Sequence, residues 1–237
     1  MKIGPTTEEQ MRRLSREWRQ GEHVLVSGAT GSGKTRLARE LDRIRINNGG
    51  FVVAFVSKLR PDATVVKEYA GWTRWTKMRK RPKPHENRIL LWPKVEGLPA
   101  REALPIQREV FAEAFDIISQ HGRWTVHVQE GLYTCSPTFL NMGPDLAMLH
   151  ALGRSADITC ITEAQRPSHL PLILYGSASH AFVGRTRESA DLKRLSEMGG
   201  KVSSRELGER IAANGRHDFL WLPVAPDWEP ETVNLAK

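Results

Sequence analysis

The first residues that could do chemistry stand in a glycine-rich stretch, residues 25–40, which reads LVSGATGSGKTRLARE. Its spacing, GxxxxGK(S/T), is that of a phosphate-binding loop. Glycines let successive backbone N–H groups turn toward phosphate oxygens, and a following helix adds the positive end of its dipole. The stretch predicts binding of a nucleotide triphosphate, with Lys34 at the β and γ phosphates and the Thr35 hydroxyl on Mg²⁺. The predicted binding residues are Gly28, Ala29, Thr30, Gly31, Ser32, Gly33, Lys34 and Thr35.

A second candidate pair ends the apolar stretch WTVHVQE, residues 124–130. A Walker B strand of a P-loop NTPase ends in Asp-Glu at this point, and the second acid can hold the water that attacks the γ phosphate. Glu130 is therefore the candidate for water activation. Gln129 stands in place of the Asp, and its amide oxygen can ligate Mg²⁺ but lacks the charge that strengthens binding. The alternative is that both residues begin a solvated loop.

A sheet is needed to position these residues. The segments with apolar, β-branched or aromatic runs are predicted strands: 23–27, 51–57, 88–93, 124–128, 157–162, 180–184 and 217–223, the last of which closes the chain. The segments with helical periodicity are 6–19, where Thr6 and Glu9 have capping-box spacing, the stretch after the glycine-rich loop, 101–120, part of 138–152, 187–198 and 203–213. Strands that alternate with helices predict an α/β fold with a parallel, doubly wound sheet.

The length of 237 residues predicts a single domain, residues 1–237. Within it we distinguish an N-terminal helix (1–21), a basic insertion (58–86) and a C-terminal helix with the last strand (200–237). No apolar run approaches the roughly 20 residues of a membrane span, and the first residues lack the apolar block of a signal peptide, so we expect a cytoplasmic protein. Cys135 and Cys160 lie far apart without CxxC spacing, which predicts buried thiols.

The basic insertion carries nearly the whole net charge of +8, because residues 58–85 include nine basic and two acidic side chains. Cations attract the phosphates of nucleic acid, and the interleaved Trp72 and Trp75 could stack on bases or pack back on the domain. We predict sequence-independent contact with double-stranded DNA; the alternative is a solvated basic loop. The candidate DNA-binding residues are Arg74, Lys77, Arg79, Lys80, Arg81 and Lys83.

The stretch GRSADITCITEAQRPSHLP, residues 153–171, resembles the sensor region of the FtsK/HerA superfamily of DNA-translocating ATPases, in which the strand after Walker B runs into TQRPS. The likeness extends from residue 22 to about 222 and includes the phosphate loop, the Walker B strand and the stretch SHAFVGRTRESADLKRL. It implies a P-loop NTPase with a mostly parallel, RecA/FtsK-like central sheet flanked by helices. A stand-alone domain of this length is most similar to the viral and phage ATPases that package genomes.

The resemblance also implies roles for individual residues. Gln165 would contact the γ phosphate or the attacking water, although it could instead satisfy a backbone group at the strand end. Arg154 would be an arginine finger that completes the site of a neighbouring subunit, with a surface salt bridge as the rival role. Arg185 and Arg187 could take the finger's place. A finger acting in trans implies a ring, which in this superfamily usually has five or six subunits.

We therefore expect an ATP-hydrolysing DNA translocase that uses ATP and Mg²⁺, forms a homo-oligomeric ring and packages a viral genome with a capsid portal as partner, in the bacterial cytoplasm if a phage encodes it. One alternative is a small-molecule kinase, which would leave AQRPS unexplained. Another is a nucleotide-gated assembly protein resembling the zonula-occludens-toxin-like relatives of the superfamily, for which Gln129 is the best argument.

Overall fold

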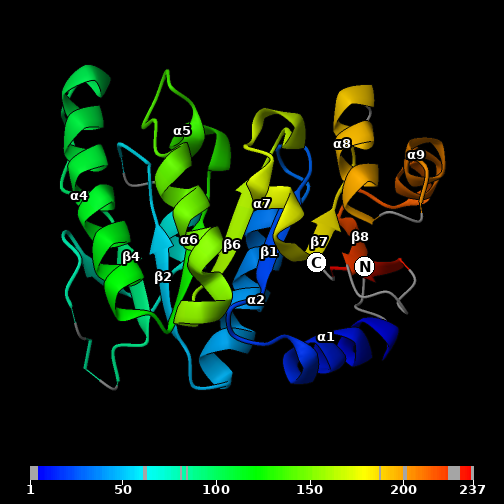
Figure 1. Ribbon diagram of the computed structural model, residues 1–237, viewed down its shortest axis with the longest axis horizontal. Coiled ribbons are helices and arrows are strands. Elements are labelled where there is room, and N and C mark those ends of the chain that lie inside the picture. The colour runs from blue at the N-terminus through cyan, green and yellow to red at the C-terminus, as the bar shows by residue number, and fades with distance from the viewer. Residues whose placement is uncertain are drawn as a thin grey trace.

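The structure, a computed structural model, describes residues 5–60, 63–80, 82–83, 85–186, 188–199, 202–223 and 230–235. The strands of these residues form one nine-stranded sheet (Figure 1). In their order across the sheet they are β3 (Thr73–Trp75), β4 (Arg88–Leu91), β2 (Phe51–Phe55), β5 (Trp124–Val128), β6 (Thr159–Ala164), β1 (His23–Ser27), β7 (Ala178–Val183), β8 (Asp218–Pro223) and β9 (Glu231–Asn234).

The strands from β3 to β7 are parallel. β1 and β5 are buried along their whole length, as expected of strands in a sheet that is covered on both faces. β6 follows β5 in the sequence but lies between β5 and β1. The carboxyl ends of these three strands therefore meet at one edge of the sheet, where ligands of open α/β sheets bind.

The other end of the sheet is antiparallel, since β8 pairs with β7 and β9 pairs with β8 in that sense. The prediction that residues 217–223 form the last strand was wrong. β9 follows, and in it Val233 is the one fully buried side chain, so the sequence offers too little apolar periodicity to reveal it. The sheet is thus mostly, and not wholly, parallel.

Helices cover both faces of this sheet. On the face toward the viewer in Figure 1, α4 (Ala100–His121) and α6 (Gly143–Ala156) pack on the strands, and α8 (Ser189–Gly199) and α9 (Ser204–Ala213) continue the layer. α1 (Pro5–Glu17) and α2 (Lys34–Asn47) pack on the other face. The chain is already helical at Pro5, so Thr6 lies inside the first turn of α1 and is not its cap. None of the described helices has the length and apolar character to cross a membrane.

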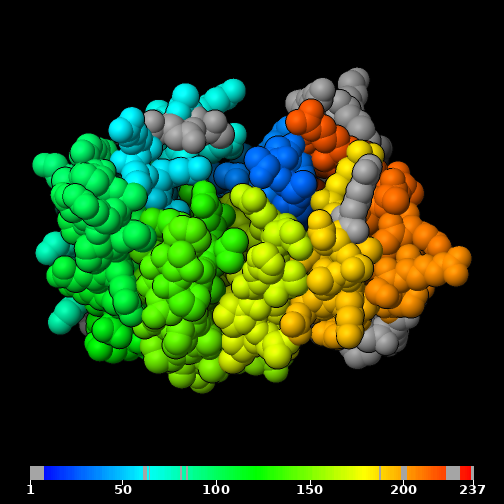
Figure 2. All heavy atoms as spheres, turned by 90° about the horizontal axis from the view of Figure 1, so that it is seen from above, coloured from blue at the N-terminus to red at the C-terminus, as the bar shows by residue number. Residues whose placement is uncertain are grey.

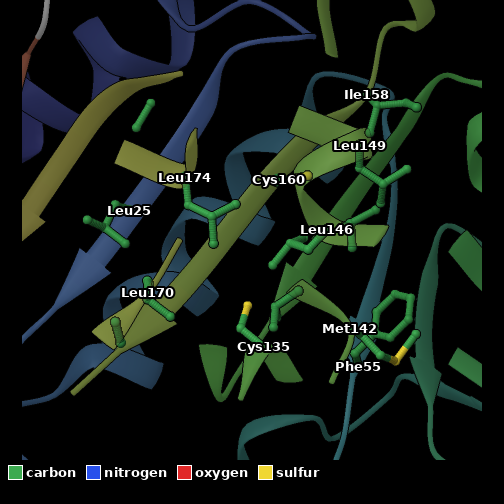
Figure 3. Packing of buried hydrophobic residues seen from close by; sticks show 14 of the residues in the cluster. Leu25, Phe55, Cys135, Met142, Leu146, Leu149, Ile158, Cys160, Leu170 and Leu174 are labelled. Carbon is green, nitrogen blue, oxygen red and sulfur yellow. The ribbon is translucent and has the colours of Figure 1, made fainter. Parts of the chain in front are cut away.

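The larger core cluster contains both cysteines (Figure 3). Cys135 and Cys160 are free and buried among Leu146, Leu149 and other aliphatic side chains, which confirms the prediction of buried thiols. Burial raises the pKa of the Cys135 thiol to about 12 and raises the pKa of Cys160 further, because a thiolate is poorly stabilised in apolar surroundings. Neither thiol is therefore a candidate nucleophile.

The basic insertion contains regular secondary structure. It contains α3 (Ala63–Glu68) and the edge strand β3, which pairs in parallel with β4. Trp75 is 2% exposed and anchors this edge in the core, and Tyr69 packs with Trp92 in a smaller cluster. The segment therefore continues the alternation of helices and strands and does not interrupt it.

Candidate active site

The glycine-rich loop connects β1 to α2 at the carboxyl edge of the sheet. Gly33 precedes the helix with φ of 99°, a left-handed conformation that glycine adopts without strain. At Gly28 a Cβ atom would lie 3.1 Å from the backbone of Gly184, so only glycine fits between the two strands. The Lys34 ammonium donates to the carbonyl of Ala29 at 3.0 Å, inside the turn, and burial lowers the pKa of this lysine. The loop thus has the geometry expected of a phosphate cradle.

A cavity of about 600 Å³ adjoins this loop. Figure 2 looks onto this edge of the molecule, where the blue region that includes the loop lies between the cyan segment after β2 and the green and yellow segments after β5 and β6. The residues predicted from sequence that line the cavity are Thr30, Gly31, Lys34, Thr35, Gln129, Glu130 and Gln165. The structure therefore brings the loop and the three candidates that follow β5 and β6 to one cavity, although their roles remain predictions.

Glu130 lies at the mouth of this cavity, after the end of β5. Its Oε1 is 3.3 Å from Nζ of Lys58, which follows β2. Both side chains are partly exposed, so the pair is accessible to water and to a ligand in the cavity. Gln129, one residue earlier, is half-buried and also lines the cavity.

The carboxylate that does contact the loop was not predicted from the sequence. The Thr35 hydroxyl donates to Oε2 of Glu163 at 2.9 Å. Glu163 is 2% exposed and lies on β6 opposite Val26 of β1. Its other oxygen, Oε1, is 2.9 Å from Nε2 of His127 on β5.

This carboxylate is one member of a buried polar chain. Nδ1 of His127 lies 2.9 Å from Oδ2 of Asp42, which also accepts from the Arg39 guanidinium at 3.0 Å. Burial lowers the pKa of His127, but the charges and hydrogen bonds of Asp42 and Glu163 outweigh burial and raise it to about 9. The ring is therefore an imidazolium at neutral pH and donates from both nitrogens to a carboxylate on each side.

The chain continues to the surface through Arg39. Its guanidinium lies 4.3 Å from the ring centre of Tyr69 and 4.2 Å from that of Trp72, at distances typical of cation–π contacts. Trp72 belongs to the basic insertion and is half-buried. A continuous set of contacts thus joins the insertion to the phosphate loop.

Two more residues that the sequence did not suggest touch the loop from the turn before β8. Nδ1 of His217 is 3.2 Å from the carbonyl oxygen of Ser32, and an atom of the Arg216 guanidinium lies 3.4 Å from where a Cβ of Gly31 would be. The first of these contacts joins residues that are 185 positions apart in the sequence. No local spacing pattern could have indicated either residue.

The AQRPS stretch has a clear structural role. Nε of Arg166 and the backbone N–H of Ser168 donate to the two carboxylate oxygens of Asp191, each at 3.0 Å. Asp191 is fully buried on α8. This clamp fixes the turn after β6 and leaves Gln165 exposed beside the cavity.

The candidate arginine fingers lie in different places. Arg154 is exposed in the last turn of α6, just before β6, and so at the edge of the sheet opposite the phosphate loop. Arg185 follows β7 near the loop, but its guanidinium donates twice to the carbonyl of Asn214, at 2.8 and 3.1 Å. Arg187 lies outside the described residues. Within one chain, Arg154 cannot reach the cavity.

The candidate DNA-binding residues are exposed where they are described: Arg74, Lys77, Arg79, Lys80 and Lys83; Arg81 lies outside the described residues. Arg74 pairs with Glu96 and lies over Trp92, and Arg79 lies 4.8 Å from the ring centre of Trp75. Since Trp75 is buried, it packs back on the domain and is not available to stack on bases.

The comparisons with known proteins agree with this architecture. No family model matches the sequence, and no curated protein matches it. The DNA-packaging ATPase B204 from Sulfolobus Turreted Icosahedral Virus has a similar structure, with a TM-score of 0.62 and 16% identity over 92% of this chain and 100% of that chain. VirB4 of Thermoanaerobacter pseudethanolicus gives a TM-score of 0.64 and 9% identity over 91% of this chain and 89% of that chain.

A third similar structure is the conjugation coupling protein TcpA of pCW3, in its monomer form with ATPγS. It gives a TM-score of 0.55 and 13% identity over 93% of this chain and 60% of that chain. The chain therefore has the α/β fold of P-loop NTPases, with a mostly parallel sheet flanked by helices. The expected fold, a P-loop NTPase with a mostly parallel central sheet flanked by helices, is confirmed.

Proposed function

We propose that this chain is an ATPase that moves double-stranded DNA as a homo-oligomeric ring of five or six copies, with the packaging of a viral genome as its task. The cavity beside the phosphate loop carries the proposal, because the loop, the Glu130 carboxylate and the Gln165 amide line it together. The fold adds support, since proteins described as a DNA-packaging ATPase and a conjugation coupling protein share it.

The donor atoms at the loop suit ATP with Mg²⁺. Magnesium prefers hard oxygen ligands, and the cavity offers the Thr35 hydroxyl, the Gln129 amide and the Glu163 carboxylate. When bound, Mg²⁺ would neutralise charge on the β and γ phosphates. Lys34, already held inside the turn, would add a second positive charge at the same phosphates.

Glu130 is the residue that would orient and deprotonate the attacking water. A carboxylate is a weak base in water, but a positioned one contributes typically about 100- to 10,000-fold to a rate. Its pairing with Lys58 holds the carboxylate at the mouth of the cavity. Gln165, which also lines the cavity, would contact the γ phosphate or the same water and so respond to hydrolysis.

The position of the arginines supports the proposal of a ring. Arg154 lies at the opposite edge of the sheet from the cavity of its own chain, so it would act only on a neighbour's nucleotide. A guanidinium at the γ phosphate offsets charge that spreads in the transition state. Arg185, held by Asn214, is the less suitable candidate because it would have to give up two hydrogen bonds.

The partner in this proposal is the DNA backbone. The exposed cations of the insertion attract phosphates without reading bases, as sequence-independent movement requires. We expect the motor to work in the cytoplasm of a host cell, a bacterium if a phage encodes it, with a capsid portal as the structure that receives the DNA.

The decisive experiment compares steady-state ATP hydrolysis with and without long double-stranded DNA at moderate salt, for the wild type and for Glu130→Gln. We expect DNA to stimulate the wild type and the variant to lose turnover while it still binds ATP. Phosphoryl transfer to a small acceptor instead of water would identify a kinase.

One observation favours a second candidate, a nucleotide-gated assembly protein. Gln129 gives the end of β5 no charge for a metal, and weak metal chemistry suits switching better than turnover. ATP binding with no hydrolysis by the wild type, with or without DNA, would select this candidate.

A further inference from the structure

The carboxylate that faces the phosphate loop is on β6 and not at the end of β5. β6 lies next to β1, and Glu163 pairs in register with Val26, two residues before the loop begins at Gly28. β5 is one strand further from β1, and Gln129, which follows the last residue of β5, carries no charge. The position that usually supplies a metal-binding acid is thus neutral, while an acid stands one strand closer.

The hydrogen bond between Thr35 and Glu163 prepares the hydroxyl for a cation. Because the hydroxyl donates its proton to Oε2 of Glu163, both lone pairs of its oxygen remain available to a cation. The carboxylate also places a negative charge directly behind this oxygen. Both residues line the cavity together with Lys34.

Glu163 is held in this position from the other side. His127 donates to its second oxygen, and Asp42 orients the far side of the imidazole ring. A buried carboxylate is costly unless it is paired and hydrogen-bonded, and here both oxygens have a partner. The fold thus compensates the burial of an acid that it places directly against the loop.

We propose that Glu163 replaces the missing strand-end aspartate and is the carboxylate that holds the Mg²⁺ of the bound nucleotide through the Thr35 hydroxyl, with His127 and Asp42 as positioning residues. The inference rests on the nucleotide chemistry proposed above. It explains how a chain with Gln129 after the end of β5 retains a charged metal site.

The test measures metal binding directly, without turnover. Protein saturated with ATPγS is titrated with Mn²⁺, and bound metal is followed by electron paramagnetic resonance for the wild type, Glu163→Gln and Gln129→Ala. We expect Glu163→Gln to weaken Mn²⁺ binding by about 10- to 100-fold, the effect usual when a partner of a metal ligand is removed, and Gln129→Ala to weaken it by less than about threefold. Fluorescent ADP in EDTA should bind both variants as it binds the wild type.

Moving the carboxylate provides a second check. In Glu163→Gln with Gln129→Asp, an acid returns at the end of β5, and we expect Mn²⁺ affinity to recover in part. Circular dichroism and thermal melting establish that each variant is folded. Since Gln129→Ala changes a half-buried side chain outside the polar chain, it remains informative even if Glu163→Gln unfolds.

The outcomes separate the two proposals. Mn²⁺ affinity unchanged in Glu163→Gln, or abolished in Gln129→Ala, would overturn the assignment of Glu163 and leave nucleotide binding intact. Failure of the folded wild type to bind any nucleotide would instead refute the proposed function. A matched variant, His127→Asn, should lower Mn²⁺ affinity without changing metal-free ADP binding if His127 positions Glu163; an equal fall in both would show a role in folding alone.

Discussion

Lys58 and Glu130 form an ion pair across the mouth of the cavity, with Nζ and Oε1 3.3 Å apart. Lys58 follows β2 and Glu130 follows β5, and these strands are neighbours in the sheet. The carboxylate of the candidate base is thus engaged by an ammonium group. A carboxylate that holds an ammonium is less free to turn toward a water.

We therefore expect Lys58→Ala to raise ATP hydrolysis in the absence of DNA. The increase should be about two- to fivefold, because an ion pair as exposed as this one contributes about 1 kcal/mol or less. Lys58→Arg, which can keep the pair, is the control and should behave as the wild type. A tenfold fall in the DNA-free rate of Lys58→Ala would mean that the lysine takes part in the reaction and does not restrain Glu130.

Two inactive variants should rescue each other if Arg154 acts on a neighbouring subunit. Glu130→Gln removes the water-activating carboxylate and Arg154→Ala removes the finger, and each alone should lower the hydrolysis rate by about 100-fold or more. In a mixed ring, an Arg154→Ala chain keeps its own Glu130 and can receive Arg154 from a Glu130→Gln neighbour. Mixing the two should restore part of the activity, measured as phosphate release.

Mixing Glu130→Gln with Arg185→Ala tests the competing assignment in the same assay. Recovery with this second mixture and none with the first would identify Arg185 as the finger. No recovery with either would argue against a site shared between subunits.

Replacing Lys77, Lys80 and Lys83 by alanine should weaken DNA binding and its dependence on salt. For every phosphate that the variant no longer neutralises, the slope of log K against log salt should fall by about 0.9. The measurement is fluorescence anisotropy with double-stranded DNA at several salt concentrations. Lys193→Ala, which removes an exposed charge on α8, is the control for net charge. An equal effect of Lys193→Ala would show attraction by net charge without a defined surface.

Stability should fall as the pH is lowered from about 6.5 to about 4, in part because of His180. Burial lowers the pKa of this histidine to about 4, while Nδ1 accepts a hydrogen bond from the Trp221 indole at 3.3 Å. Between these pH values the unfolded chain binds a proton that the folded chain does not, so acid favours unfolding. The shift corresponds to about 3 kcal/mol in all.

His180→Gln isolates this contribution, because an amide oxygen can still accept from the indole and does not titrate. Thermal unfolding followed between pH 7 and pH 4.5 should give a shallower loss of stability in the variant. Parallel curves for the two proteins would rule out His180 as the cause.

Much of the fold was predictable because its elements are locally marked. β1 and β5 are short strands rich in β-branched and aromatic or aliphatic residues, and they were predicted residue for residue. β3 was missed because two of its three residues are exposed and Trp75 alone enters the core, and β9 was missed for the same lack of periodicity. Edge strands with one buried residue show no alternation of apolar and polar residues, so they are hard to predict from the sequence.

The residues of the site likewise fall into those that a local sequence pattern predicts and those that only long-range contacts bring together. The phosphate loop is a contiguous spacing pattern, whereas the contacts from Glu163 to His127 and from His127 to Asp42 span 36 and 85 residues. Only the sheet order, which inserts β6 between β1 and β5, brings them together. The sequence did offer one indication of a buried ion pair, because Glu163 is a single acid within the apolar strand β6. An acidic residue is almost never fully buried unless it is paired. The catalytic and DNA-binding roles remain predictions.

The contacts that lead from Trp72 through Arg39, Asp42 and His127 to Glu163 have a thermodynamic consequence. A ligand that changed the packing of Trp72 would alter the free energy of the Arg39 contact and, through the ion pairs, that of the acid behind Thr35. Linkage is reciprocal, so a nucleotide state that changed the contacts of Thr35 would also change the affinity of the insertion for its ligand. The affinity of the insertion for its ligand could then change with each nucleotide state without a large movement of the backbone, because the coupling free energy passes through side chains that are already in contact.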